Sequence, residues 1–170
     1  MIDIYYTYAN VKSDDFIIAI LEKYYNIRVD ALLRSINGKP FIAGRKVHFN
    51  LTHSKGLTAL AVGKTRLGLD CESLDGKARP AVLQRFTERE KEEISSLSDF
   101  FAHWTARESF IKFWGESLAS CWRKVEFLQG NIYFRGEKQE QQITQFTFQN
   151  YIFSLCGSDT KYTLRPADKI

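Results

Sequence analysis

The sequence predicts an α+β fold in which helices pack on antiparallel sheet. Two observations carry this prediction. Runs of β-branched and aromatic residues lie before and after two segments with helical periodicity, and the last third of the chain alternates between apolar and polar residues. Strands grouped apart from helices are typical of α+β proteins. At 170 residues, 44% hydrophobic and 26% charged, the chain is long enough for one compact unit.

The first third of the chain predicts a strand, a helix and a hairpin. Residues 2–8 are β-branched or aromatic, as in a strand. Ser13 offers N-cap chemistry to a helix whose apolar residues recur at helical spacing until Asn26. The pair Asn37–Gly38 predicts a turn between two short extended pieces.

Two apolar runs, 57–62 and 67–72, flank residues 63–66 and predict a second hairpin. Asp70 and Glu72 are two residues apart in the later run, so on a strand both carboxylates share one face. Acids within an apolar strand pattern must face water or a cation.

Two further helices are predicted before residue 116. The shorter, 88–94, follows Thr87, which forms a capping-box pattern with Glu90. The longer, 99–114, is expected to begin at Ser98 as its N-cap.

On the longer helix Trp104, Glu108 and Lys112 are four residues apart and form one stripe. Glu108 before Lys112 is the preferred order for a solvent-facing ion pair, and spacing alone favours that interpretation. If the helix lies across the strand with Asp70 and Glu72, three carboxylates converge without His or Cys. Such a set describes a hard-cation site, and Mg²⁺ completes its shell with water and substrate phosphate.

The remainder of the chain predicts an antiparallel meander of about four strands. The segments are 124–134, 143–148, 151–156 and 161–166.

Composition excludes several classes of protein. The net charge of +4 is spread along the chain and does not indicate nucleic-acid binding. No apolar run is long enough to span a membrane, and no secretory signal is apparent, so we expect a cytoplasmic protein. The cysteines and histidines lack the spacing of a disulfide framework or a zinc site. They are Cys71, Cys121, Cys156, His48, His53 and His103.

Five motifs between residues 38 and 118 occur in an order that resembles the phosphopantetheinyl transferase family. They are GKP at 38–40, FNLTHS at 49–54, GLDCE at 68–72, RFTEREKE at 85–92 and WTARESFIKFWGESL at 104–118. Together they are most similar to the surfactin-type branch. That resemblance implies two similar halves in a pseudo-dimer, each a helix on a small antiparallel sheet. Residues 1–67 would be a shortened first half, and 68–170 a second half carrying the metal and phosphate motifs, within a single monomeric unit.

The resemblance implies transfer of the phosphopantetheine arm of coenzyme A to a serine of an acyl or peptidyl carrier protein, with adenosine 3',5'-bisphosphate leaving. It places Mg²⁺ on Asp70, Glu72 and Glu108, and makes Glu108 the candidate base for the carrier serine. Asp70, Glu108 and Lys112 would be the catalytic set. Positioning and charge neutralisation are what displacement at a pyrophosphate requires.

The same resemblance assigns the cofactor contacts. Lys112 and Arg107 would contact phosphates, while Lys39, Thr52 and His53 would receive the adenosine 3'-phosphate region. Each has a structural alternative: Lys39 could be a solvated turn residue, and His53 could serve a loop by hydrogen bonds.

Large apolar residues around these motifs are expected in the core rather than in contact with cofactor or carrier. They are Trp104, Phe110, Ile111 and Trp114, and, as candidates for gripping a carrier, Leu83, Phe86, Phe100 and Phe101.

Three departures from the family pattern leave alternatives open. Thr52 replaces the usual Ser, Arg107 the usual Lys, and Ser117 the second glycine of a turn. The basic pair of longer relatives is not matched, and Lys12, Arg28 or Arg34 are the residues that could substitute. A non-catalytic relative that binds coenzyme A or a carrier is the alternative function, and an oligomer with sites between chains is the alternative assembly. The carrier, the pathway and any preference among acyl forms are not predicted.

Overall fold

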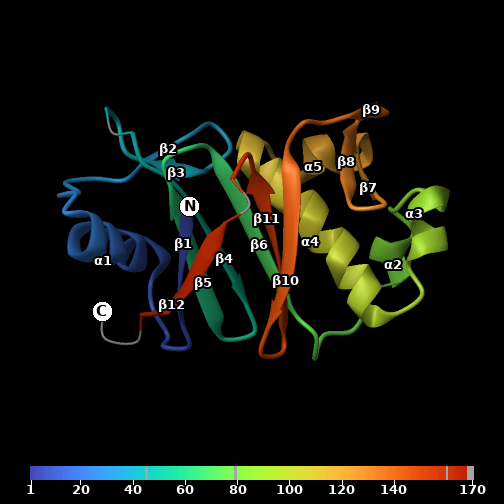
Figure 1. Ribbon diagram of the computed structural model, residues 1–170, viewed down its shortest axis with the longest axis horizontal. Coiled ribbons are helices and arrows are strands. Elements are labelled where there is room, and N and C mark those ends of the chain that lie inside the picture. The colour runs from blue at the N-terminus through green and yellow to red at the C-terminus, as the bar shows by residue number, and fades with distance from the viewer. Residues whose placement is uncertain (45, 79, 160, 168–170) are drawn as a thin grey trace.

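The computed structural model describes residues 1–44, 46–78, 80–159 and 161–167 and has an α+β fold, as predicted (Figure 1). Its strands are β1 (Ile2–Thr7), β2 (Leu33–Arg34), β3 (Pro40–Phe41), β4 (His48–Ser54), β5 (Leu57–Gly63), β6 (Leu67–Ser73), β7 (Val125–Leu128), β8 (Asn131–Phe134), β9 (Glu137–Lys138), β10 (Gln142–Phe148), β11 (Tyr151–Gly157) and β12 (Tyr162–Pro166). Its helices are α1 (Ser13–Tyr25), α2 (Pro80–Leu83), α3 (Glu88–Glu93), α4 (Leu97–Trp114) and α5 (Leu118–Cys121), with a 3-10 turn at Trp122–Lys124.

Two sheets form the centre of the molecule. The first has the strand order β12–β1–β5–β4, and the second has the order β10–β11–β6. Alternation along the strands gives each sheet two apolar faces: Tyr5 and Leu60 pack with α1, whereas Ile4 packs with Leu69 and Phe153 of the second sheet. The layers are therefore α1, first sheet, second sheet and α4, and Figure 1 shows the two helices on opposite sides of the strands.

The same strand order occurs twice. In the first sheet β1, α1, β4 and β5 occur in this order along the chain, with β2 and β3 between α1 and β4, and the strands give the antiparallel order β1–β5–β4. In the second sheet β6, α4, β10 and β11 give the antiparallel order β6–β11–β10. The boundary expected after residue 67 falls at the first residue of β6.

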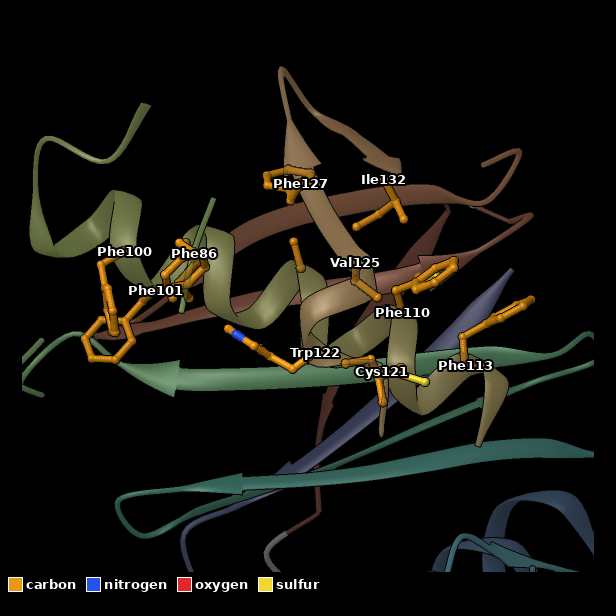
Figure 2. Close-up of a cluster of buried hydrophobic side chains, with 14 residues drawn as sticks. Phe86, Phe100, Phe101, Phe110, Phe113, Cys121, Trp122, Val125, Phe127 and Ile132 are labelled. Atoms are coloured by element: carbon orange, nitrogen blue, oxygen red, sulfur yellow. The ribbon is translucent and has the colours of Figure 1, made fainter. Parts of the chain in front are cut away.

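Helix α4 is buried on more than one side, because β6, β10 and β11 lie against one face, β7 and β8 lie against another, and α3 reaches it through ion pairs. Figure 2 shows the apolar cluster around it, including Phe86, Phe100, Phe101, Phe110 and Trp122. The core prediction for Phe86, Phe100 and Phe101 is confirmed, whereas Trp114 is 46% exposed and does not belong to the core.

The N-terminus of α4 differs from the prediction. Ser96, not Ser98, is the N-cap, and it forms a capping box with Asp99. Both serines precede an acidic residue, but only Ser96 has an acid at the third helical position, where its side chain can return a hydrogen bond to the cap. The capping box of Thr87 and Glu90 at α3 is confirmed.

The hairpin predicted around residues 63–66 is wrong. Strand β5 already pairs with β1 on one edge and β4 on the other, so no edge is left for β6. The hairpin lies instead between β4 and β5, where Lys55 and Gly56 have φ angles of 40° and 85°. Two consecutive positive φ angles are the mark of a tight type I′ turn.

The predicted four-strand meander is also only partly correct. Strands β10 and β11 pair with each other, and β7, β8 and β9 form a separate small sheet. Strand β12 leaves this region and pairs in parallel with β1, from Ile2–Tyr162 to Tyr6–Pro166. All three cysteines are free and buried. In the described ranges, no helix is both long and apolar enough to cross a membrane.

Candidate active site

The carboxylates of β6 lie on the face of the strand that meets α4. Leu69 and Cys71 point the other way, into the apolar layer between the sheets, so the predicted alternation is confirmed. Asp70 is only 5% exposed, and Glu72 is half-buried.

Gly68 allows α4 to approach this face closely. A Cβ atom at Gly68 would lie 2.0 Å from the carbonyl oxygen of Ser109 and 2.5 Å from the backbone nitrogen of Phe113. Both of these atoms belong to the helix backbone and cannot rotate away. The glycine therefore sets the distance at which Glu108 and Lys112 reach the carboxylates of β6.

Lys112 pairs with Asp70 rather than forming the solvent-facing pair with Glu108. Its Nζ lies 2.6 Å from Oδ1 of Asp70 and also donates to the carbonyl of Leu69 at 3.3 Å. Burial would lower the pKa of Lys112, but the Asp70 carboxylate outweighs burial and raises the pKa above its ordinary value. Burial in turn raises the pKa of Asp70, and Lys112 is the strongest of the groups that oppose this effect.

Glu108 stands in a strongly negative environment. Burial, and then the charges of Asp70 and Glu72, raise the pKa of Glu108 to about 8, while Lys112 acts in the opposite direction. One ammonium group thus faces three carboxyl groups. A carboxyl with a raised pKa in a cleft is typical of functional sites.

One carboxylate oxygen has no partner in the described part of the protein. Oδ1 of Asp70 accepts from Lys112 and from Thr52 at 3.1 Å, whereas Oδ2 is buried without a hydrogen bond. A buried oxygen of this kind is costly unless something else binds it. Among the described residues no group of three His, Cys, Asp or Glu side chains is arranged as a ready metal cluster. The orphaned oxygen and the all-oxygen donor set nevertheless fit a hard cation.

Seven of the predicted site residues line one cleft of about 470 Å³ between α1, the β2–β3 hairpin, β4, β6 and α4. They are Lys39, Thr52, His53, Asp70, Glu72, Glu108 and Lys112. The structure thus brings together residues separated by more than 70 positions in sequence.

Lys39 reaches the cleft but its ammonium group is already engaged. Nζ donates to the carbonyls of Lys112 at 2.6 Å, Leu67 at 3.2 Å and Phe113 at 3.4 Å. Two of these carbonyls lie in the last turn of α4, where a positive charge is favourable. Burial, followed by the charges of Arg66 and Lys112, lowers the pKa of Lys39 to about 8.

Arg107 does not lie at the site, which corrects the expectation of a phosphate contact. Its side chain is 1% exposed, forms an ion pair with Glu90, and lies between the rings of Phe86 and Trp122 at 4.8 and 4.6 Å. Consecutive residues on a helix point about 100° apart, so when Glu108 faces β6 its neighbour Arg107 turns toward α3. Arg107 is a core residue.

Arg34 is a cleft residue that the sequence did not single out from its alternatives. It lines the cleft, lies 2.6 Å from Asp14 and donates to the carbonyl of Gly38 at 3.1 Å. Arg28 pairs with Asp30 on the surface. No local signal distinguishes these arginines, because the cleft wall forms only when the hairpin folds against α1.

The structure has two units, each a sheet with a packed helix, and a cleft lined by carboxylates and lysines between them. Sequence comparison identifies the class of protein to which the chain belongs. Residues 66–156, more than half of the chain, match the model of the 4'-phosphopantetheinyl transferase superfamily. The chain belongs to this superfamily, so the resemblance is confirmed. The matched range includes Asp70, Glu72, Glu108 and Lys112.

Individual relatives agree with the family. The chain is 30% identical over 131 residues to the 4'-phosphopantetheinyl transferase gsp of Aneurinibacillus migulanus, covering 71% of this chain and 55% of that protein. It is 36% identical over 95 residues to the 4'-phosphopantetheinyl transferase HetI of a Nostoc species, covering 48% of this chain and 40% of that protein. It is 32% identical over 89 residues to the 4'-phosphopantetheinyl transferase of Bacillus subtilis, covering 48% and 40%. The chain spans about half the length of these relatives or less.

Proposed function

We propose that this chain transfers the 4'-phosphopantetheine arm of coenzyme A to a serine of an acyl or peptidyl carrier protein and releases adenosine 3',5'-bisphosphate. The observation that carries the proposal is the cleft in which Asp70, Glu108 and Lys112 meet. Its position within the range that matches the superfamily, and the printed names of the relatives, support the same reaction.

In the proposed reaction the serine oxygen bonds to the phosphorus that carries pantetheine. The bond from that phosphorus to the bridging oxygen breaks, and adenosine 3',5'-bisphosphate leaves with the electron pair. Glu108 accepts the serine proton. A carboxylate can take this proton when it lies within hydrogen-bond reach of the hydroxyl.

We propose Mg²⁺ as the cofactor, held by Asp70, Glu72 and Glu108. The free Oδ2 of Asp70 and the excess of carboxyl groups over ammonium groups support this choice. When bound, the ion would neutralise charge on the pyrophosphate. Lys112 opposes the burial that raises the pKa of Asp70, and it adds a positive charge beside the phosphates.

The adenosine end of coenzyme A is proposed to lie toward the β2–β3 hairpin. Arg34, on β2, lines the cleft and keeps about half of its side chain exposed, and His53 lines the same cleft from β4. Lys39, whose ammonium group binds a carbonyl at the end of α4, contributes a further positive charge. Thr52 donates its single O–H to Asp70, so we propose no phosphate contact for it.

The two units of the molecule are proposed to be the halves of a pseudo-dimer in one cytoplasmic, monomeric chain. The repeated orders β1–β5–β4 and β6–β11–β10 support this arrangement, as does the long helix, α1 or α4, that lies along the chain between the first strand and the other two in each unit. Asp70, Glu72, Glu108 and Lys112 come from the second unit, whereas Lys39 and the adenosine end come from the first.

A non-catalytic relative that binds coenzyme A or a carrier is the second candidate. It is favoured by the engagement of Lys39 with three carbonyls. Ser117 no longer supports it, because this residue is the N-cap of α5 and accepts from the backbone of Ser120.

The test is to incubate the protein with coenzyme A, Mg²⁺ and several diverse apo carrier proteins and to weigh the carriers. We expect Glu108→Gln to lower the rate about 10²-fold or more, as for loss of a general base. Glu88→Gln is the matched control, because Glu88 lies on α3 with 86% of its side chain exposed. Coenzyme A binding in calorimetry without any carrier adduct would favour the second candidate instead.

A further inference from the structure

Strands β4 and β6 run side by side in the same direction, joined by side chains of β4. No main-chain pairing between them is found in the described part of the chain. Instead Asn50 Oδ1 accepts from the N–H of Leu69 at 2.7 Å. Thr52 Oγ1 accepts from Cys71 N–H at 3.2 Å, and Ser54 Oγ accepts from Ser73 N–H at 3.1 Å. We call this row of three contacts the seam.

Two members of the seam also hold a carboxylate. Thr52 donates its O–H to Oδ1 of Asp70 at 3.1 Å, and Ser54 donates to Oε2 of Glu72 at 2.8 Å. The arrangement repeats: each hydroxyl binds the acid 18 positions later and the amide 19 positions later. A hydroxyl has one hydrogen to donate, and in both residues that hydrogen is bonded to the carboxylate.

Asn50 joins the two strands but holds no carboxylate. It satisfies the Leu69 amide, but position 68, where the same pattern would place an acid, is a glycine. The seam therefore contains an internal control: one member joins the strands alone, and two members also orient carboxylates.

We propose that Thr52 and Ser54 are positioning residues that orient Asp70 and Glu72 for a divalent cation. The inference rests on the proposed metal site. Thr52 and Lys112 together occupy Oδ1 of Asp70 and leave Oδ2, buried and unpartnered, for the ion. Partners of metal ligands typically change metal affinity by about 10- to 100-fold when removed.

The experiment measures Mn²⁺ binding to the folded protein, without coenzyme A or carrier, from the electron paramagnetic resonance signal of free Mn²⁺. Thr52→Val keeps the shape but removes the hydroxyl, and we expect about 10- to 100-fold weaker binding. Thr52→Ser restores the hydroxyl and should restore affinity. Asn50→Leu should lower the unfolding temperature, because it breaks the seam, while Mn²⁺ affinity stays within about twofold of wild type, since no carboxylate loses a partner.

If Thr52→Val fails to fold, Ser54→Ala decides, because Ser54 lies nearer the surface and Ser54→Thr is its matched rescue. The inference would be overturned if a folded variant without the hydroxyl bound Mn²⁺ as tightly as the wild type. It would also be overturned if Asn50→Leu lost as much Mn²⁺ affinity as that variant, or if the wild type did not bind Mn²⁺. Carrier modification is scored separately. Hydroxyl-dependent Mn²⁺ binding without transfer would uphold the positioning role and reject the proposed function.

Discussion

Gly68→Ala is the substitution that most directly tests how the fold builds the site. The added Cβ would lie 2.0 Å from Ser109 O and 2.5 Å from Phe113 N, both backbone atoms of α4. To reach an ordinary contact distance the helix must move away from β6 by about 1.5 Å. Glu108 and Lys112 move with it.

The expected cost in unfolding free energy is about 3 kcal/mol, the upper range for overpacking, because no side chain can rotate to make room. For a chain of this size that corresponds to a fall in melting temperature of roughly 6–12 °C. Displacement of reacting groups by about 1 Å typically costs about 100-fold in rate, so carrier modification should fall by that factor.

The assays are urea unfolding and the rate of carrier modification below the melting temperature. Gly157→Ala is the matched control. Gly157 lies on the neighbouring strand β11, and its Cβ would meet nothing closer than 3.6 Å. Gly68→Ala with stability within about 1 kcal/mol of wild type and an unchanged rate would refute the reasoning.

Three further predictions follow from individual contacts. Arg34→Ala should raise the KM for coenzyme A about tenfold at constant kcat, as expected for uniform binding, in steady-state kinetics; an altered kcat with unchanged KM would count against it. Arg107→Met should lower the unfolding free energy by about 3–5 kcal/mol, since it leaves Glu90 buried without its cation, and should leave the KM of the folded fraction unchanged. Burial raises the pKa of Asp3, but hydrogen bonds from Thr163, Arg165 and Tyr25 outweigh it and hold the pKa below its usual range. The stabilisation by Asp3 is thus present above about pH 4 and lost as the pH falls through the folded-state pKa. Asp3→Asn should flatten the acid limb of a plot of melting temperature against pH, and an unchanged slope would contradict this.

The parts of the site that depend on local periodicity were predictable from sequence. Alternation along residues 67–72 put Asp70 and Glu72 on one face, and the helical spacing of Glu108 and Lys112 put them on one stripe. Both features follow from backbone geometry alone.

The parts of the structure that depend on long-range pairing were not predictable from the sequence. The edges of β5 are filled by β1 and β4, and β12 returns to pair with β1; neither fact is encoded in the residues of the strands concerned. Arg107 was misassigned for a related reason, because its burial depends on Glu90 arriving from another helix.

The seam also could not be predicted from the sequence. Thr52 appeared as a hydroxyl in a motif, and only the side-by-side arrangement of β4 and β6 shows that its donor goes to Asp70. Gly68 belonged to a recognised motif, but the need for glycine there becomes clear only when α4 is in place.

The intact mass of a carrier protein is the measurement that tests the central claim most directly. After incubation with this chain, coenzyme A and Mg²⁺, we predict a gain of one phosphopantetheine group on the carrier serine, with one adenosine 3',5'-bisphosphate released for each carrier modified. Unmodified carriers throughout a diverse set, with the wild-type chain folded, would contradict it.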